Sequence, residues 1–335
     1  MSLPPSEIPL GAMRFNSDSQ KLEYWMGSAW MQIQTFSPNL DGGARGLIGA
    51  RYNGEYRNTV DFITIPTAGN ATDFGDDTAG FYGVAGGASN TRAIYAGGSN
   101  PSTGNSNEIR YATFSSTGNF VDFGDLTTGR RGNGSVSNQT RFVIGGGYDG
   151  SNYTNILDFV TIASTGNAVD FGDTVAGTAN LGGVNSPTRG VFCNGASTAG
   201  TNILQFITIA STGNAVDFGD SPTLKVETMC ASSATRGVNM GGVQPSPEVA
   251  TTSIAFLTIA TLGNSIDFGD LTAARQHAMG LGDTIRAVCA GGVTINTIDY
   301  INISTGGDAT DFGDMTTTGW SADGGGISNG HGGLG

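Results

Sequence analysis

One tetrapeptide, Asp-Phe-Gly-Asp, recurs six times in the 335 residues and constrains the fold more than any other feature. Its glycines stand at positions 75, 124, 172, 219, 269 and 313, spaced by 49, 48, 47, 50 and 44 residues. A period of that size is typical of repeat folds built from one supersecondary unit. A four-stranded propeller blade needs about 40 to 50 residues, so the period predicts one blade per repeat.

Each repeat carries runs that are typical of β-strands. β-Branched, aliphatic and aromatic side chains dominate residues 156–162, and similar runs occupy 203–209 and 254–259. A Ser-Thr-Gly-Asn sequence at 164–167 predicts a tight turn, because its glycine supplies the positive φ that a short hairpin needs. In this copy we predict four strands, near residues 130–137, 140–146, 156–162 and 168–171.

The second predicted strand occurs six times, and an arginine marks each copy. Too few residues precede the first of these arginines for a complete copy, whereas residues 315–329 follow the sixth motif. We therefore expect the C-terminal segment to complete the first blade, which removes the open edges of an unclosed array. The six arginines are Arg45, Arg92, Arg141, Arg189, Arg236 and Arg286.

A pair of glycines follows the second strand in four copies, at 97–98, 146–147, 241–242 and 291–292. Without side chains, backbones can approach closely at these points near a propeller axis. In these glycines and in the length of the period, residues 37–335 resemble the kelch-type propellers. The expected fold of this region is all-β: a six-bladed kelch-like β-propeller closed by the C-terminus.

Residues 1–36 do not follow the repeat and predict a small β-meander. Its strands are expected at 13–16, 22–25 and 30–33. Three short strands cannot bury a core alone, so large aromatic side chains here are expected to pack on a partner. The predicted docking residues are Phe15, Tyr24, Trp25 and Trp30.

Residues 9–16 and 22–30 resemble a short module of tail-fibre and other virion structural proteins of tailed bacteriophages. The adjoining Asp-Phe-Gly-Asp repeats are similar to those of virion proteins from phages of marine cyanobacteria. These resemblances imply a virion structural protein in a tail fibre or tail-associated appendage. Residues 1–36 would attach to other virion proteins, and the propeller would contact the host surface.

Other functions are compatible with the same residues. One alternative is an architectural decoration or spacer of the virion that binds no receptor. A second, outside viruses, is a cellular kelch-like scaffold, which the N-terminal module disfavours. Because fibre attachment is often threefold, a homotrimer is a further alternative to a single copy.

The charge balance argues against several classes of partner. Aspartate and glutamate total 28 against 15 lysines and arginines, a net charge of −13, so no basic surface is expected for nucleic acid or anionic membranes. No stretch approaches the roughly 18 apolar residues of a membrane span. Three scattered cysteines predict neither a disulfide framework nor a zinc motif.

Few residues suit catalysis. His277 and His331 are the only histidines, and neither an H-E-x-x-H nor a P-loop motif occurs. Residues 326–330 match G-x-S-x-G, but at this glycine content a chance match is expected, and a nucleophile elbow needs a following helix. We expect no enzymatic activity.

The repeated arginines and aspartates are predicted to be structural partners. Each arginine is expected to fork onto a nearby motif carboxylate and join blade to blade, since the two features occur in equal number. The alternative is a ring of arginines that captures an anionic sugar. The aspartates concerned are Asp73, Asp122, Asp170, Asp217, Asp267 and Asp311.

The same aspartates could also serve as cation ligands. Two carboxylates per motif fall short of the six to eight oxygens that Ca²⁺ takes, so we expect the motifs to form turns and strand ends. No metal or cofactor is predicted, with Ca²⁺ as the alternative.

The loops between the second and third strands vary in length and composition, while the Ser-Thr-Gly-Asn turns hardly change. Tyr, Asn, Ser and Gly in these loops are adaptable contact residues suited to sugars and protein surfaces. A host-surface glycan or protein is the expected ligand, and solvated loops without a ligand are the alternative. The predicted binding residues are Tyr148, Asp149, Tyr153 and Asn155.

Overall fold

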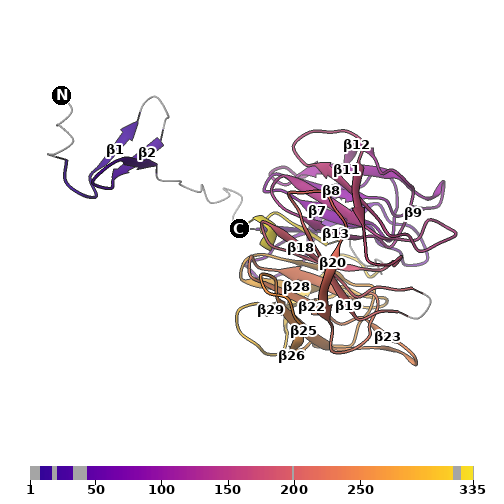
Figure 1. Ribbon diagram of the computed structural model, residues 1–335. Helices are drawn as coiled ribbons and strands as arrows, with labels where there is room; N and C mark the ends of the chain where they lie inside the picture. Colours follow the sequence, from indigo (N-terminus) through magenta and orange to yellow (C-terminus); the bar gives the residue numbers. More distant parts are fainter. Residues whose placement is uncertain (1–7, 17–20, 33–43, 198–199, 320–325, 335) are drawn as a thin grey trace. The chain divides into compact units, whose positions relative to one another are not determined.

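The computed structural model describes residues 8–16, 21–32, 44–197, 200–319 and 326–334 (Figure 1). The chain divides into two compact units, residues 1–42 and 43–335. The predicted boundary between residues 36 and 37 lies outside the described residues. Within the described ranges, no helix is long and apolar enough to span a membrane.

The larger unit is all-β, and its described residues form six antiparallel sheets of four strands each, which is consistent with the predicted β-propeller (Figure 1). The first sheet contains β31 (Gly326–Ser328), β4 (Arg45–Ile48), β5 (Thr59–Thr64) and β6 (Thr72–Asp76). The second contains β7 (Ala85–Ala88), β8 (Arg92–Ala96), β11 (Glu108–Thr113) and β12 (Val121–Asp125). The third contains β13 (Gly134–Ser137), β14 (Arg141–Gly145), β15 (Ile156–Thr161) and β16 (Val169–Asp173).

The remaining three sheets repeat this order of strands. The fourth contains β17 (Gly182–Asn185), β18 (Arg189–Cys193), β19 (Ile203–Thr208) and β20 (Val216–Asp220). The fifth contains β21 (Met229–Ser232), β22 (Arg236–Met240), β25 (Ser253–Thr258) and β26 (Ile266–Asp270). The sixth contains β27 (Met279–Gly282), β28 (Arg286–Ala290), β29 (Thr297–Asn302) and β30 (Thr310–Asp314).

Among the described residues of this unit there are also two small hairpins and one short helix. The hairpins are β9 (Ser99–Asn100) with β10 (Gly104–Asn105), and β23 (Val243–Pro245) with β24 (Glu248–Ala250). Each lies in the loop between the second and third strands of its sheet. The 3₁₀ helix η2 (Gly332–Leu334) follows β31.

The first strand of the first sheet comes from the far end of the sequence. In the other five sheets the four strands follow one another along the chain, whereas β31 pairs antiparallel with β4, with Ile327 opposite Leu47. The first strands of the six sheets contact one another in the order β7, β13, β17, β21, β27, β31 and back to β7.

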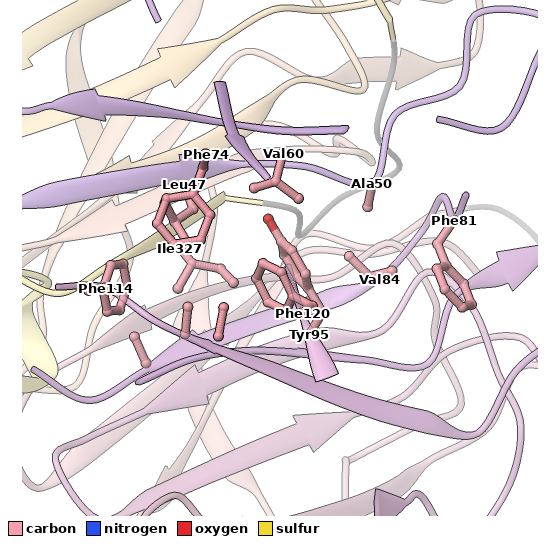
Figure 2. Packing of buried hydrophobic residues seen from close by; sticks show 13 residues of the cluster. Leu47, Ala50, Val60, Phe74, Phe81, Val84, Tyr95, Phe114, Phe120 and Ile327 are labelled. Carbon is pink, nitrogen blue, oxygen red and sulfur yellow. The ribbon is translucent and has the colours of Figure 1, made fainter. Parts of the chain in front are cut away.

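Apolar side chains fill the space between neighbouring sheets. Figure 2 shows one such cluster, in which Leu47 and Phe74 of the first sheet pack with Tyr95 of the second and Ile327 of β31. The rings of Tyr95 and Phe120 stack with centroids 4.9 Å apart. Both faces of a sheet contribute to such clusters, which explains why the third strand of each repeat is largely apolar on both sides, apart from one buried column that holds Asp61, Arg110, Asp158, Gln205 and Asp299.

The motif glycine allows each sheet to touch the turn of the next. Gly75 has a φ of +148°, and a Cβ atom there would lie 2.5 Å from the carbonyl oxygen of Gly118. In the actual structure Gly118 N donates to the carbonyl oxygen of Phe74 (2.8 Å), and Asp76 N donates to Asn119 Oδ1 (3.0 Å). The motif therefore ends a sheet and receives the Ser-Thr-Gly-Asn turn of its neighbour.

The predicted ion pairs between the repeated arginines and the motif aspartates are wrong in the structure. Arg189 Nη1 instead donates to the carbonyl oxygen of Ile259 at the third strand of the next sheet (2.9 Å), and its guanidinium carbon lies 4.5 Å from the centre of the Phe206 ring. The arginines that make the equivalent carbonyl and ring contacts are Arg45, Arg92, Arg141, Arg236 and Arg286.

The reason for the difference is the orientation of the fourth strand. Its first aspartate faces solvent in all six sheets, so the guanidinium groups meet an aromatic ring and a carbonyl oxygen instead. The aspartates exposed in this way are Asp73, Asp122, Asp170, Asp217, Asp267 and Asp311. Each arginine still joins one sheet to the next, as predicted, but through a backbone acceptor.

The smaller unit is a three-stranded meander of β1 (Met13–Asn16), β2 (Lys21–Trp25) and β3 (Trp30–Gln32). The expectation that Trp25 docks on a partner is wrong, because this ring is 7% exposed and packs at 5.5 Å on Trp30. Arg14 lies 4.2 Å above the Trp30 ring and forms an ion pair with Glu23 (2.8 Å). On this polar face of the meander Trp25 is therefore buried and Trp30 is half-buried.

The opposite face of the meander is apolar and exposed. Phe15 and Tyr24, both predicted docking residues, lie on it. Met13 is paired with Tyr24, Phe15 with Leu22, and Tyr24 with Met31, so their side chains share one face of the sheet. We call these five residues the meander face: Met13, Phe15, Leu22, Tyr24 and Met31.

Candidate functional site: a tyrosine and arginine ridge

The two ends of the sheets differ in sequence. At one end lie the near-identical turns between third and fourth strands. At the other lie the loops between second and third strands, together with the connections from each fourth strand to the next sheet. We call this second end the loop face. Loops of residues 97–107, 146–155 and 241–252 differ there in length and composition, so this end offers the more varied surface.

Two of the four predicted binding residues meet on the loop face. The rings of Tyr148 and Tyr153 lie with centroids 5.6 Å apart within one loop of the third sheet. Tyr148 also pairs through its backbone with Arg131 in the connection between β12 and β13, with N to O distances of 3.1 and 2.8 Å. The guanidinium carbon of Arg131 lies 5.2 Å from the centre of the Tyr148 ring.

Three more tyrosines extend this group of ring contacts. Arg131 also lies 5.9 Å from the ring of Tyr82, which stands in the connection between β6 and β7. Tyr82 lies 5.9 Å from Tyr52 and 5.6 Å from Tyr56, and these two rings are 5.0 Å apart. Five of the nine tyrosines therefore form one continuous group with Arg131, across loops of three sheets. We call it the tyrosine–arginine ridge: Tyr52, Tyr56, Tyr82, Arg131, Tyr148 and Tyr153.

The ridge residues are held by buried neighbours in the chain. Arg130, directly before Arg131, is buried and forms an ion pair with Asp158 (3.1 Å). Arg51, directly before Tyr52, pairs in the same way with Asp61 (2.9 Å). Phe81, directly before Tyr82, lies under the guanidinium of Arg110 at 3.7 Å, and Arg110 pairs with Asp77 (3.0 Å). Three buried anchors thus fix the positions of Tyr52, Tyr82 and Arg131.

These anchors carry an electrostatic cost. Burial lowers the pKa of Arg130, and the neighbouring Asp158 carboxylate opposes that change. Removing one partner of such a pair leaves an uncompensated buried charge. Any rearrangement that separated such a pair would therefore be costly, which favours one arrangement of the loop face.

A depression of about 390 Å³ opens beside the ridge. Tyr82, Arg131, Tyr148 and Tyr153 form part of its lining, with Asn180 and His277 from later connections. Its remaining lining residues are Gly132, Ala179 and Ala196. No aliphatic side chain larger than alanine is among these described lining residues, so the depression is aromatic and polar.

One position of the repeat has a strained backbone in three copies, two of which line the depression. The residue seven positions after the motif is Gly83 or Gly132 in two copies, with φ of +69° and +63°. In the next three copies it is Asn180, Glu227 and His277, with φ of +56°, +59° and +53°. A left-handed backbone costs a residue with a side chain about 1–2 kcal/mol, and such strain is concentrated at functional sites.

These three side chains are linked in a polar row. His277 Nε2 lies 3.0 Å from Glu227 Oε2, and Asn180 Nδ2 donates to Glu227 Oε1 at 3.5 Å. Asn180 and His277 both border the depression. Amide, carboxylate and imidazole groups at this point can donate hydrogen bonds to a polar ligand and accept them from it.

The other two predicted binding residues, Asp149 and Asn155, accept hydrogen bonds from backbone N–H groups of the protein. Asp149 Oδ1 accepts from the backbone N–H groups of Ser151 and Asn152, both at 2.7 Å. These bonds, that of Asn152 first, lower the pKa of Asp149. Asn155 is exposed, and its carbonyl oxygen accepts from Thr174 N (2.7 Å). Neither residue borders the depression.

Most of the site could not be predicted from the sequence, since its residues come from different repeats and from the connections between sheets. The signal that was available is the column seven residues after each motif, where two glycines are followed by Asn180, Glu227 and His277. The tyrosines of the first two repeats show no such alignment.

The G-x-S-x-G match begins in a strand, and in the described part of the chain it is not followed by a nucleophile elbow helix. Ser328, the central residue of the G-x-S-x-G match, is buried in β31, and its Oγ donates to the carbonyl oxygen of Gly282 (2.5 Å). Within the described residues, no three His, Cys, Asp or Glu side chains gather in a way that could hold a metal ion.

No protein-family model matches the chain, and no curated protein matches it significantly.

Proposed function

We propose that residues 43–335 form a six-bladed kelch-like propeller, with each four-stranded sheet as a blade and β31 closing the ring. The cyclic order of contacts among first strands supports this arrangement. So does the hydrogen bonding of the turns, because Gly69 N donates to Phe312 O (2.8 Å) between the first and sixth sheets just as Gly118 N donates to Phe74 O between the second and first. Closure of this kind leaves only short, protected sheet edges.

The function we propose is that of a virion structural protein, in a tail fibre or tail-associated appendage, whose loop face contacts the host surface. The observation that carries the contact role is the tyrosine–arginine ridge. Tyrosine and arginine give large, rigid contact area and are enriched where proteins recognise ligands. Their concentration on the variable end of the sheets, away from the uniform turns, favours recognition over simple solvation.

The N-terminal unit would then attach the protein to other virion proteins. The meander face supports this role, since five large apolar side chains lie exposed on three short strands. An apolar sheet face of this kind is typical of an interaction site. A homotrimer through this unit is part of the same proposal, and light scattering of the full chain would test it.

The alternative remains an architectural decoration or spacer protein of the virion without receptor binding. The resemblance to virion proteins supports both roles equally, and only the ridge favours the first. We propose no catalytic activity, no bound cofactor, no nucleic acid partner and no membrane insertion.

A pair of variants in the virus tests the proposal. A chain lacking residues 1–36 should fold but be absent from purified particles. Tyr148→Ala combined with Tyr153→Ala should be incorporated normally and reduce adsorption to host cells at least tenfold. Immunogold electron microscopy of the particles measures incorporation and position.

The possible outcomes separate the two roles. Normal incorporation of the shortened chain would contradict the attachment role. Full adsorption by the tyrosine variant, with the protein present at the particle surface, would leave the architectural alternative.

A further inference from the structure

We propose that the ridge and its depression bind a carboxylate-bearing saccharide, with sugar rings stacked on the tyrosines and the carboxylate held by Arg131. The inference rests on the proposal that the loop face is the binding face of the protein. It adds the chemical class of the ligand and the group that selects it.

The arrangement of the aromatic rings favours a saccharide strand. Neighbouring members of the ridge lie 5.0 to 5.9 Å apart, so an extended chain of rings can contact several of them in turn. The sugar ring presents C–H groups that pack on an aromatic face, while its hydroxyl groups need polar partners. Tyrosine supplies both an apolar ring and a polar tip.

The lining of the depression disfavours a protein partner. The buried centre of a protein interface is enriched in apolar side chains and depleted in charge. Here the largest aliphatic lining residues are Ala179 and Ala196, and the lining also includes Asn180 and His277, both of which contact Glu227. Such polar lining groups suit a ligand covered with hydroxyl groups, each of which can donate and accept a hydrogen bond.

The charge on Arg131 indicates an acidic group in the ligand. Other arginines have partners within the protein: Arg51, Arg110, Arg130 and Arg275 form buried ion pairs with aspartates, and Arg57 pairs with Glu55. Among the ion pairs of the described residues, none involves Arg131, whose Nη1 donates to the amide oxygen Asn105 Oδ1 at 3.3 Å. The planar fork of arginine matches a carboxylate in geometry.

The site is organised before a ligand arrives. Arg131 is fixed by its backbone pairing with Tyr148, and Asn105 Nδ2 also donates to the carbonyl oxygen of Tyr148 (2.9 Å). The buried ion pair of Arg130 and Asp158 also fixes the connection between β12 and β13, in which Arg131 lies. A rigid site loses little conformational entropy on binding, which favours affinity.

The test uses the purified full chain and a panel of oligosaccharides of galacturonate, glucuronate, sialate and ketodeoxyoctonate. Each is compared with its methyl ester, which keeps the sugar rings and removes the charge. Isothermal titration calorimetry should show that at least one acid binds at least tenfold more tightly than its ester. Inorganic phosphate serves as a probe for a site that recognises any anion.

Variants assign the binding to the ridge. Arg131→Met should remove the preference of the acid over the ester. Tyr148→Ala should weaken both ligands, whereas Tyr148→Phe, which keeps the ring, should retain binding. Arg57→Met, on the same face but paired with Glu55, is the matched control and should bind as the unchanged chain does. Circular dichroism melting of each variant confirms that it is folded.

Several results would overturn the inference. These are no binding of any acid at millimolar concentration, equal binding of acids and esters, phosphate binding as tight as that of the best acid, or an unchanged preference in Arg131→Met. None of them concerns incorporation into particles, so the inference can fail while the proposed virion role stands. Conversely, acid binding by a protein that is absent from virions would contradict only the virion role.

Discussion

At equivalent positions of the repeats, a hydrogen-bond acceptor in the third strand and its donor in the preceding connection differ together. Asp158 in the third strand of its sheet accepts hydrogen bonds from Thr127 N (3.2 Å) and Thr127 Oγ1 (2.9 Å) of the preceding connection. In the next sheet Gln205 Oε1 accepts from Val175 N (2.7 Å). The equivalent residue in the fifth sheet is alanine, which cannot accept, and there the equivalent donor is Pro222, which has no N–H. The pattern avoids an unsatisfied buried donor in that sheet.

Asp158→Ala should destabilise the protein by about 3–5 kcal/mol, because it leaves Arg130 as an unpaired buried charge. Gln205→Ala removes an uncharged acceptor at the equivalent position and should cost about 1–3 kcal/mol. Urea denaturation followed by fluorescence measures both free energies of unfolding. A smaller loss for Asp158→Ala than for Gln205→Ala would show that the ion pair does not stabilise the loop face.

Gly75→Ala should be strongly destabilising, for two reasons at one residue. The φ of +148° is unfavourable for a side chain, and the added Cβ would lie 2.5 Å from Gly118 O in the next sheet. The backbone term alone is about 1–3 kcal/mol. The matched control is Gly306→Ala, where the nearest atom is 3.6 Å away and a change within about 1 kcal/mol is expected. Equal effects in denaturant would refute the close-approach explanation of the motif.

At the scale of elements, the arginine that begins each second strand links two sheets. Arg189→Met should lower the free energy of unfolding by about 1–3 kcal/mol, since it removes the bond to Ile259 O and the contact with Phe206. Thermal and urea denaturation measure the loss. Arg57→Met, an exposed pair on the loop face, should change stability by less than about 1 kcal/mol. If both variants unfold alike, the inter-sheet contact contributes nothing measurable.

The strands themselves were largely predictable. The third sheet was expected at 130–137, 140–146, 156–162 and 168–171, and its strands are Gly134–Ser137, Arg141–Gly145, Ile156–Thr161 and Val169–Asp173. Periodic apolar residues and turn glycines carry that information locally. The hairpin of β9 and β10 was missed, because Ser, Asn and Gly have low strand propensity and form it only in context.

Contacts between distant elements were not predictable from residue types. Counting arginines and aspartates suggested that they pair, but only the structure shows the aspartates facing solvent and the guanidinium groups on rings and carbonyl oxygens. The ridge likewise combines Tyr52, Tyr82 and Tyr148 from three repeats in loops that do not align. Tertiary placement, not local pattern, decides such contacts.

At the scale of the whole molecule, the segment after β31 fills space between the first strands. His331 is buried there, with Nε2 donating to Ala88 O (3.0 Å) and Nδ1 accepting from Gly333 N (3.1 Å). Burial lowers the pKa of His331 to about 4, from an ordinary value of 6.5. The imidazole therefore remains neutral in the folded protein until the medium is strongly acidic.

Stability should depend on pH through this residue. Below pH 6.5 the unfolded chain binds a proton at His331 and the folded chain does not, so the stabilisation is complete above pH 6.5 and is lost as the pH falls toward 4. The expected loss is about 3 kcal/mol. Urea denaturation at pH 7.5 and 4.5 measures it, with His331→Gln as the control, whose stability should fall less. Parallel losses in both proteins would contradict the assigned pKa.

If β31 closes the proposed ring of blades, deleting residues 326–335 should open it. Removal exposes the edge of β4 and the apolar surface that Ile327 covers. Differential scanning calorimetry should show a melting temperature at least about 10 °C below that of the full chain, partly restored by adding the ten-residue peptide. A shortened chain that melts like the full one, with no response to the peptide, would contradict the closure.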